Sequence, residues 1–251
     1  MGLLLFDVGN TQIKWRFLDG DSVLRGVGSS LEGQRDWLSG LARRFSGVTG
    51  VAISCVKSAE YRAALVEDVR QLLGLDPYIA EVESRAFGLS CSYEDPSRMG
   101  VDRWLAMISA KEAFDGAFCV IDCGSAVTID WVSVDGRHEG GFILAGLRLS
   151  IEALLGGTDQ VVVDFDNLAA ATTEPGVSTT EAVYHGALFG LLAQVEAAYA
   201  KLLVMAGDDD SNLILTGGDA KLLSEKLNVP HRLVDDLVFD GLRRAFYDSR
   251  V

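Results

Sequence analysis

The sequence predicts an α/β protein built from two similar domains. Short apolar runs alternate with helical patterns, and 27 glycines against 4 prolines favour tight turns between regular elements. The motif that opens the chain also recurs near its middle, followed by the same order of elements. A chain of 251 residues is long enough for one large domain or two small ones.

The first half reads as three strands followed by an alternation of helix and strand. Residues 3–6 are an apolar run that ends at Asp7, and 12–17 place alternate apolar residues on one face, as in a half-buried strand. Asp19-Gly20 is a hairpin turn signal, and 22–28 is expected to return as a third strand. Another buried strand is expected at 51–54, between helices at 34–44 and 60–73.

The second half repeats this opening. The apolar run 118–121 ends at Asp122, the alternating run 128–134 follows, and after the turn Asp135-Gly136 the residues 140–144 can form the returning strand. A D-x-G sequence alone is common in turns, but the matching features in register favour a duplication. We therefore expect two α/β domains that face each other, 1–115 and 116–251. The expected later elements are helix 103–114, helix 180–205, strand 212–216 and helix 220–227.

Composition excludes several classes of function. The net charge is −14, from 22 Lys and Arg against 36 Asp and Glu, which argues against binding to nucleic acid or to an anionic membrane. The uncharged stretch 182–195 is too short to span a bilayer, and the first residues lack the features of a signal peptide. The four cysteines form no CxxC pair and are expected to be reduced thiols. These features favour a cytoplasmic protein.

Asp7 and the polar residues after it fit a platform for phosphate and a metal ion. Gly9 lets the backbone approach a ligand closely, and Asn10 and Thr11 can donate hydrogen bonds to phosphate oxygens. Asp7 can hold Mg²⁺ directly or through water, and Lys14 adds a positive charge. One such motif alone is better explained as a hairpin turn with an Asx cap, whereas two opposed copies favour a cleft for a triphosphate.

A polar loop with Tyr93 and Gly100 leads into the expected helix 103–114. Asp102 on its own is better explained as the N-cap of that helix. In a nucleotide cleft, the same carboxylate could accept a hydroxyl proton while Arg103 steers an anionic substrate.

Other motifs are less specific. Gly217-Gly218-Asp219 is explained equally well as a turn and as a close approach to a ligand. Ser178 and Glu181 form a capping box, and the helix that begins there also offers N–H groups to a carboxylate. The three histidines are scattered, which argues against a zinc site, and the lack of G-x-S-x-G argues against a Ser-His-Asp triad. The chain has no Walker A motif and no G-x-G-x-x-G.

Four segments together resemble type III pantothenate kinase, and their order and spacing cover nearly the whole chain. They are Asp7-Val8-Gly9-Asn10-Thr11, Gly100-Val101-Asp102-Arg103, Asp122-Cys123-Gly124-Ser125-Ala126 and Thr216-Gly217-Gly218-Asp219-Ala220. The resemblance implies two duplicated actin-like (ribonuclease H-like) domains with an ATP cleft between them, as in the acetate kinase, sugar kinase and actin superfamily. It also implies ATP-dependent phosphorylation of pantothenate, the first step towards coenzyme A. The implied enzyme is a cytoplasmic homodimer that needs Mg²⁺ and a monovalent cation, K⁺ or NH₄⁺.

The resemblance further implies roles for individual residues. Asp102 would be the general base, Asp122 would bind the monovalent cation, and Asp7 would hold Mg²⁺ together with ATP. The implied nucleotide contacts are Asp7, Val8, Gly9, Asn10, Thr11, Gln12, Ile13, Lys14 and Ser125. The implied pantothenate contacts are Tyr93, Gly100, Val101, Asp102, Arg103 and Thr179.

Two positions depart from the family's pattern. The family usually has threonine where this chain has Ser125, and serine keeps the hydroxyl, so we expect weaker packing rather than lost binding. The usual G-G-x-I-x-P-G segment has Ala145 at the proline position, which loosens a turn.

Two other functions fit the same fold. A non-catalytic regulator would be expected to have lost Asp7, Asp102 or Asp122, and this chain has all three. A phosphatase of the superfamily would hydrolyse its substrate without pantothenate, and the segment Gly100 to Arg103 argues against it.

Overall fold

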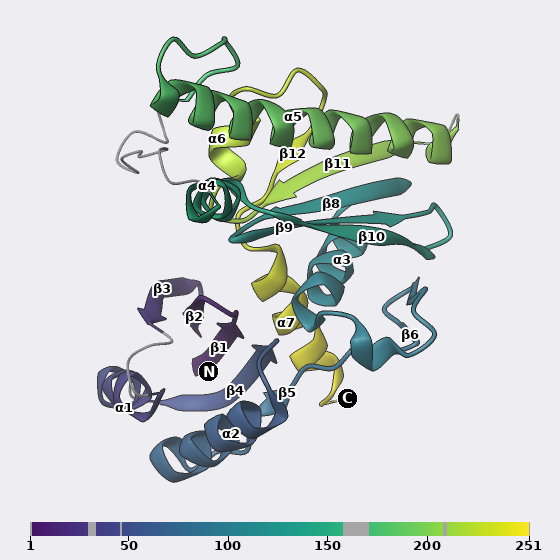
Figure 1. The fold of residues 1–251 in the computed structure, drawn as a ribbon. Coiled ribbons are helices and arrows are strands. Elements are labelled where there is room, and N and C mark those ends of the chain that lie inside the picture. The colour runs from purple at the N-terminus through teal and green to yellow at the C-terminus, as the bar shows by residue number, and fades with distance from the viewer. Residues whose placement is uncertain (1, 30–33, 46, 158–170, 208–209, 251) are drawn as a thin grey trace. The chain divides into compact units, whose positions relative to one another are not determined.

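The computed structural model describes residues 2–29, 34–45, 47–157, 171–207 and 210–250. The chain forms two compact units, each with its own sheet and helices (Figure 1). Unit 1 consists of Met1–Phe87, Tyr93–Ser109 and Leu237–Val251, and unit 2 consists of Gly88–Ser92 and Ala110–Asp236. The segment that contains residues 88–92 therefore belongs to unit 2, although unit 1 precedes and follows it in the sequence.

Unit 1 is a five-stranded sheet in the order β3-β2-β1-β4-β5. Its strands are β1 (Gly2–Val8), β2 (Gln12–Asp19), β3 (Ser22–Ser29), β4 (Val48–Cys55) and β5 (Tyr78–Ile79). β1 pairs antiparallel with β2 and parallel with β4, so it lies in the centre of the sheet. Its residues Leu3, Leu4, Leu5 and Phe6 are all buried, which explains why the strand reads as a continuous apolar run.

Helices cover both faces of this sheet. They are α1 (Gln34–Arg44), α2 (Ala59–Leu73) and α7 (Leu237–Asp248). Helix α3 (Val101–Ala113) packs against α7, where a Cβ at Gly241 would overlap the Leu105 carbonyl, and its residues after Ser109 belong to unit 2. Leu38 of α1 and Leu65 of α2 join Leu4 and Phe6 in one core cluster. On the other face, α7 contacts β1 and β4, and Gly50 leaves the space that the ring of Phe246 fills. The short elements β6 (Arg85–Ala86), β7 (Leu89–Ser90) and η1 (Pro96–Arg98) lie between α2 and α3 in the sequence.

Unit 2 contains a second five-stranded sheet with the order β10-β9-β8-β11-β12. Its strands are β8 (Ala117–Cys123), β9 (Ala126–Val132), β10 (His138–Ala145), β11 (Ser211–Thr216) and β12 (Arg232–Leu233). Its other helices are α4 (Leu147–Gly156), α5 (Thr179–Ala206) and α6 (Ala220–Ser224). The strand order and the pairing directions match those of unit 1 element by element, which confirms the expected duplication and the α/β fold class.

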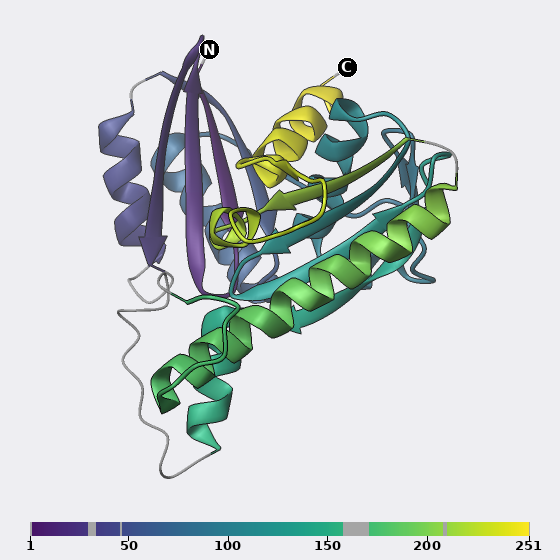
Figure 2. The ribbon, with the colours of Figure 1, turned by 90° about the horizontal axis from the view of Figure 1, so that it is seen from above.

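Helix α5 is long and apolar enough to cross a membrane by length and composition alone. It lies along the sheet of unit 2, as Figure 2 shows, and it contacts β8 and β11. Leu188, Leu191, Leu192, Val195 and Leu202 of this helix are buried in the core of unit 2. Packing on the sheet accounts for the 33% of its most apolar window that is buried, whereas Phe189, Leu203 and Val204 of the same helix are exposed.

Most elements expected from the sequence are present within one or two residues of the expected limits. The strand expected at 128–134 is shifted to Ala126–Val132, and the helix expected at 220–227 ends at Ser224. The two compact units are not separated by one boundary between residues 115 and 116, because the last helix, α7, belongs to unit 1. The domains 1–115 and 116–251 as folding units stay a prediction. All four cysteines are free thiols.

Candidate functional site

Asp7 lies at the carboxyl end of β1, next to the strands on either side. In the register of the sheet it stands opposite Lys14 of β2 and beside Ser54 of β4. Directly opposed residues of an antiparallel pair place their side chains on the same face, so the carboxylate and the ammonium group share one face of the sheet. The Ser54 hydroxyl donates a hydrogen bond of 3.4 Å to Asp7 Oδ1. The half-buried carboxylate is thus held at the sheet edge where the next loop begins.

The loop between β1 and β2 is a tight turn. The Gly9 N–H donates to the carbonyl of Gln12 at 3.0 Å, and a Cβ at Gly9 would stand 3.2 Å from that oxygen. Asn10 and Thr11 at the tip are exposed. The turn therefore presents short polar side chains to solvent directly after Asp7, as the phosphate-platform hypothesis requires.

Tyr93 and Arg103 form a second polar group in unit 1. The Arg103 Nη1 donates to the Tyr93 hydroxyl at 3.1 Å, and the guanidinium carbon lies 5.9 Å from the centre of the tyrosine ring. Arg103 is 6% exposed, although arginine is almost never buried without partners. The positive charge is therefore held in place within the structure rather than carried on a freely moving side chain.

Asp102 lies inside the first turn of α3 and is not its N-cap. Gly100 occupies the cap position, because its carbonyl accepts the Trp104 N–H at 3.2 Å as the first helical hydrogen bond. Asp102 Oδ1 accepts the Arg103 N–H at 2.8 Å and would stand 2.6 Å from a Cβ at Gly100. A glycine is needed there because the carboxylate folds back over it. Asp102 is therefore not explained as an N-cap, and its carboxylate lies in the first turn of α3.

Asp122 is the counterpart of Asp7 in unit 2. It lies in β8 opposite Thr128 of β9 and beside Thr216 of β11. Gly217 follows β11 with a φ of +95°, and a Cβ there would overlap Asp122 Oδ1 and the Cys123 backbone. The glycine therefore lets the end of β11 pass directly against the carboxylate.

Ser125 lies in the turn between β8 and β9 and is exposed. Its carbonyl accepts the Gly146 N–H at 3.0 Å, so the turn is tied to the start of α4. The neighbouring Ala145, at the position of the family's proline, accepts a 3.3 Å hydrogen bond from the Ser150 hydroxyl. These two hydrogen bonds hold a segment that proline would otherwise stiffen.

Asp219 is a further acidic residue near Asp122, and it was not among the residues expected from the sequence to form the site. Its N–H donates to the Cys123 carbonyl at 2.9 Å, while its side chain makes no capping hydrogen bond to α6. Burial raises the pKa of Asp219, and the positive charge of Arg148 opposes that shift. Burial also raises the pKa of the Cys123 thiol to about 12, with smaller contributions from the charges of Asp122 and Asp219. The sequence signal for this residue is the Gly217-Gly218-Asp219 motif, which is explained equally well as a structural turn and as a close approach to a ligand.

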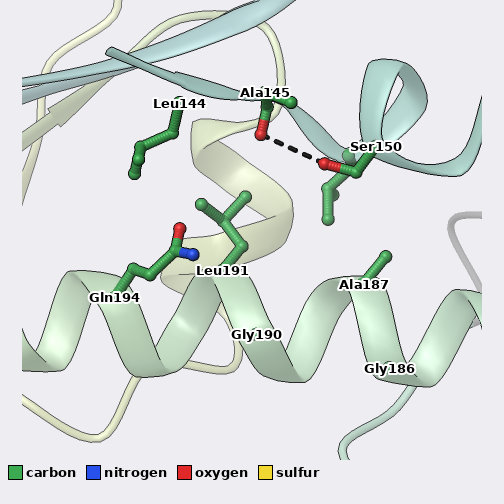
Figure 3. A pocket seen from close by; sticks show the side chains of 9 residues that line it. Leu144, Ala145, Ser150, Gly186, Ala187, Gly190, Leu191 and Gln194 are labelled. Carbon is green, nitrogen blue, oxygen red and sulfur yellow. Dashed lines mark hydrogen bonds between the residues drawn. The ribbon is translucent and has the colours of Figure 1, made fainter. Parts of the chain in front are cut away.

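Thr179 is the first residue of α5 in unit 2. The Ser178 hydroxyl accepts the Glu181 N–H at 3.2 Å, which confirms Ser178 as the N-cap. Glu181 Oε2 accepts the Val177 N–H at 2.8 Å, one residue before the N–H that a standard capping box uses. Thr179 lines a cavity of about 470 Å³ between α4 and α5. A neighbouring cavity of about 300 Å³ lies between the end of β10 and the small residues of α5, as Figure 3 shows. Of the residues expected in the site, Thr179 alone lines either of these two cavities.

The donor set fits a nucleotide-bound Mg²⁺ better than a resident metal centre. The described residues contain no group of three or more His, Cys, Asp or Glu side chains placed to hold an ion. Mg²⁺ in nucleotide sites is usually held by one or two carboxylates together with phosphates and water. A single half-buried carboxylate such as Asp7 fits that pattern.

The expected site residues fall into four groups. Within unit 1, Asp7 and Lys14 lie next to the 9–12 turn, and Tyr93 contacts Arg103 near Gly100 and Asp102. Within unit 2, Asp122 and Ser125 lie at the β8–β9 turn, and Thr179 begins α5. Val8 and Ile13 are buried in the core of unit 1, so only their backbone can reach a ligand. Val101 is likewise buried.

Comparison with known proteins shows one family. The model of the type III pantothenate kinase family matches residues 3–201. The type III pantothenate kinase of Chromohalobacter salexigens is 38% identical over 246 residues, 97% of this chain and 87% of the relative. That of Marinobacter nauticus is 37% identical, covering 96% of this chain and 97% of the relative. That of Pseudomonas aeruginosa is 35% identical with 97% and 98% coverage.

Solved structures with low sequence identity share the fold. A putative 2-dehydro-3-deoxygalactonokinase from Sinorhizobium meliloti has a TM-score of 0.58 at 15% identity, covering 98% of this chain and 96% of its own. An ethanolamine utilization protein from Carboxydothermus hydrogenoformans has a TM-score of 0.53 at 13% identity, with 96% and 89% coverage. These likenesses agree with a duplicated actin-like fold.

Proposed function

The chain belongs to the type III pantothenate kinase family, and from that premise we propose how its residues divide the transfer of a phosphoryl group from ATP to pantothenate. The protein is a pantothenate kinase, a phosphotransferase that acts in coenzyme A biosynthesis. Phosphoryl transfer depends chiefly on positioning and on stabilising charge, so each role can be assigned to groups that are held in place.

Tyr93 and the segment Gly100 to Arg103 of unit 1 are the proposed pantothenate contacts. Thr179 of unit 2 is a further contact that the family resemblance implies. The buried guanidinium of Arg103 attracts the pantothenate carboxylate, and its hydrogen bond to the Tyr93 hydroxyl fixes its direction. Asp102 accepts the proton of the pantothenate hydroxyl as the hydroxyl oxygen forms a bond to the γ-phosphorus of ATP. The bond from that phosphorus to the β–γ bridging oxygen breaks, and ADP leaves. The placement of Asp102 outside the cap position supports this role as general base.

The segment Asp7 to Lys14 of unit 1 is the proposed nucleotide-binding segment, and the family resemblance implies Ser125 of unit 2 as a further contact. The exposed side chains of Asn10 and Thr11 in the 9–12 turn would contact the phosphates, and Lys14 would balance their charge. Mg²⁺ bound with ATP supplies charge neutralisation on the phosphate oxygens, and Asp7 is the residue that would hold it. Asp122, beside the Gly217 turn, would bind the monovalent cation, K⁺ or NH₄⁺.

The observation that carries this division of labour is the joint placement of Tyr93, Asp102 and Arg103 at the start of α3. The test is a coupled assay that follows ADP formation with ATP, Mg²⁺ and K⁺, with and without pantothenate. We expect ADP release only when pantothenate is present. Equal ADP release without pantothenate would identify a phosphatase instead, and no turnover by folded protein would indicate a non-catalytic relative.

We further propose that the protein acts in the cytoplasm as a homodimer. Large apolar side chains on unit 2 support this, because Phe142, Ile143 and Phe189 are 53%, 65% and 60% exposed. Light scattering after size exclusion should give twice the 27.0 kDa chain mass. A single-chain mass at every concentration would contradict it.

A further inference from the structure

The segment Gly88–Ser92 runs along the turn between β9 and β10. The Ser90 N–H donates to the Gly136 carbonyl at 3.0 Å, and Ser90 forms an isolated parallel bridge with Arg137. A Cβ at Gly136 would overlap the Gly88 carbonyl, and its φ of +82° also favours glycine. The segment is therefore fitted closely against this turn, residue by residue.

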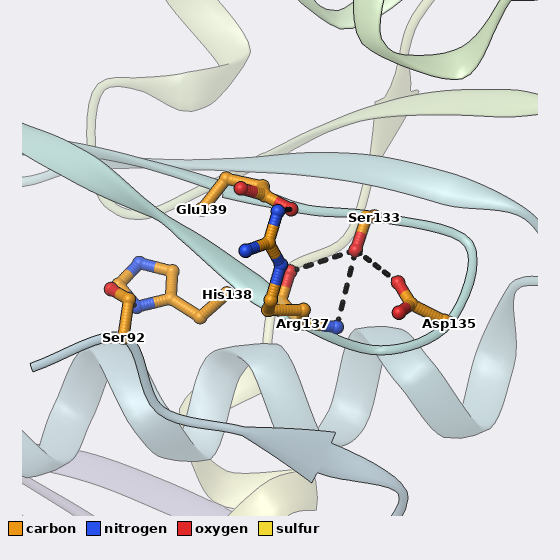
Figure 4. Close-up of polar contacts among 6 residues, drawn as sticks. All are labelled: Ser92, Ser133, Asp135, Arg137, His138 and Glu139. Carbon is orange, nitrogen blue, oxygen red and sulfur yellow. Dashed lines mark hydrogen bonds and ion pairs between the residues drawn. The ribbon is translucent and has the colours of Figure 1, made fainter.

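At the C-terminal end of this segment, three polar side chains are linked by hydrogen bonds. The Ser92 hydroxyl lies 3.0 Å from His138 Nδ1, and His138 Nε2 lies 2.9 Å from Asp130 Oδ1. His138 and Asp130 have side chains that are 0% and 2% exposed. Figure 4 shows Ser92 next to the imidazole, while Ser133, Asp135 and Arg137 form a separate network in the turn. No step of the proposed mechanism uses these three residues.

Each of the two ring nitrogens of His138 has a polar partner. Nε2 faces the Asp130 carboxylate and Nδ1 faces the Ser92 hydroxyl, and a hydroxyl can either donate to or accept from a ring nitrogen. Because both partners of the pair are buried, neither ring nor carboxylate can turn away to water without leaving a polar group unpaired. The buried pair therefore holds a fixed hydrogen-bond partner for the Ser92 hydroxyl.

Ser92 is followed directly by Tyr93, whose hydroxyl accepts from Arg103. We propose that Asp130, His138 and Ser92 are positioning residues for pantothenate: the buried pair anchors Ser92 and so fixes the backbone that carries Tyr93. This inference rests on the proposed function, because it takes Tyr93 as a substrate contact. Without the anchor, the binding-competent arrangement of Tyr93 is populated for a smaller fraction of the time. The apparent affinity for pantothenate then falls by that fraction.

The test uses Ser92→Ala, which removes the hydroxyl and leaves the buried pair intact. We expect the KM for pantothenate to rise about 2- to 10-fold, the range that one neutral hydrogen bond supports. The kcat and the KM for ATP should change less than about twofold, because Ser92 touches no reacting group. Ser92→Thr keeps a hydroxyl and should restore most of the affinity. Hydrogen exchange of the peptide that covers 88–93 should be faster in Ser92→Ala and near wild type in Ser92→Thr.

Ser224→Ala is the matched control, since the Ser224 hydroxyl makes a 2.8 Å hydrogen bond to His231 elsewhere in unit 2. It should change neither the exchange at 88–93 nor the KM for pantothenate. An unchanged KM and unchanged exchange in Ser92→Ala would overturn the inference when Tyr93→Ala raises the KM. If Tyr93→Ala also leaves the KM unchanged, the assignment of Tyr93 in the proposed function is wrong. The substrate part of the inference then fails as well, and the exchange experiment alone decides whether Ser92 anchors the segment.

Discussion

The carboxylate of Asp122 lies so close to Gly217 that any side chain at position 217 would overlap its Oδ1 atom. This contact joins the end of β8 to the end of β11, two parallel strands of one sheet. The backbone of Gly217 has a φ of +95°, so the position also disfavours every residue that carries a Cβ. Asp122, which is proposed to bind the monovalent cation, can therefore keep its position only because residue 217 has no side chain.

Gly217→Ala should therefore displace Asp122 and strain the backbone. We expect the free energy of unfolding to fall by about 1–3 kcal/mol, with a larger loss of kinase activity than the stability change alone would cause. Chemical denaturation and the coupled assay measure the two effects. Gly218→Ala is the control, since a Cβ there meets nothing within 4 Å, and it should be nearly neutral. Equal effects of the two substitutions would contradict this account.

Asp102→Asn should abolish turnover and leave ATP binding intact. The amide keeps the size of the side chain but cannot accept the hydroxyl proton, and loss of a general base typically costs about 10²- to 10⁴-fold in rate. Steady-state kinetics give the rate, and equilibrium titration with ATP gives the affinity. A variant that keeps a tenth or more of the activity would show that Asp102 does not act as the base.

Asp122→Asn should respond to monovalent cations in a way that Asp102→Asn does not. Removing the charge lowers cation affinity, so raising K⁺ or NH₄⁺ should recover part of the activity. Activity as a function of K⁺ concentration is the measurement, with Na⁺ as the ionic-strength control. A loss that no cation concentration reduces would remove the cation role of Asp122 but not the family membership.

Asp219 should make the folded protein less stable as the pH rises. Burial raises its pKa above the value in the unfolded chain, so the folded state binds the extra proton and the stabilisation is lost as the carboxyl ionises. Asp219→Asn should raise the Tm at pH 7 and leave it unchanged at about pH 2.5, well below the ordinary aspartate pKa, where the carboxyl is protonated in both states. Asp135→Asn is a control of opposite sign, because the Ser133 hydroxyl lowers the pKa of Asp135. A Tm difference for Asp219→Asn that is the same at both pH values would contradict the linkage.

An alkylating reagent should react faster with the partly exposed thiol of Cys91 than with the three buried thiols. Cys55, Cys119 and Cys123 are buried and Cys91 is partly exposed. Burial raises the pKa of the Cys123 thiol to about 12, so little of the reactive thiolate is present at pH 8. Brief alkylation of the native protein should modify Cys91 first, and the same treatment in denaturant should modify all four, as mass spectrometry of peptides can show. Early labelling of Cys123 would show that the β8–β11 edge opens in solution.

The sequence predicts the sheets because their signals are local. Asp7 and Asp122 follow buried apolar runs, and each precedes an alternating strand and a D-G turn; all these features lie within about twenty residues. The match of the two halves then predicts the duplication, and the matching strand orders confirm it.

What the sequence missed depends on contacts between distant segments. Helix α7 packs on β1 and β4, more than 180 residues away along the chain, and no local pattern shows that pairing. The Ser92–His138–Asp130 chain likewise joins three separate segments, so a search for the local G-x-S-x-G motif could not find it. Asp102 was open to an N-cap explanation because only the backbone shows that Gly100 takes that position.

The return of α7 to unit 1 has a consequence for synthesis on the ribosome. Unit 1 begins with β1 but lacks the helix that covers one face of β1 and β4 until Leu237–Asp248 has been made, after the whole of unit 2. The ring of Phe246 packs into the space beside Gly50, and Gly241 packs against the Leu105 carbonyl. During translation, unit 2 can therefore complete its core first. Until α7 has been made, the apolar face of β1 and β4 stays accessible to chaperones and proteases.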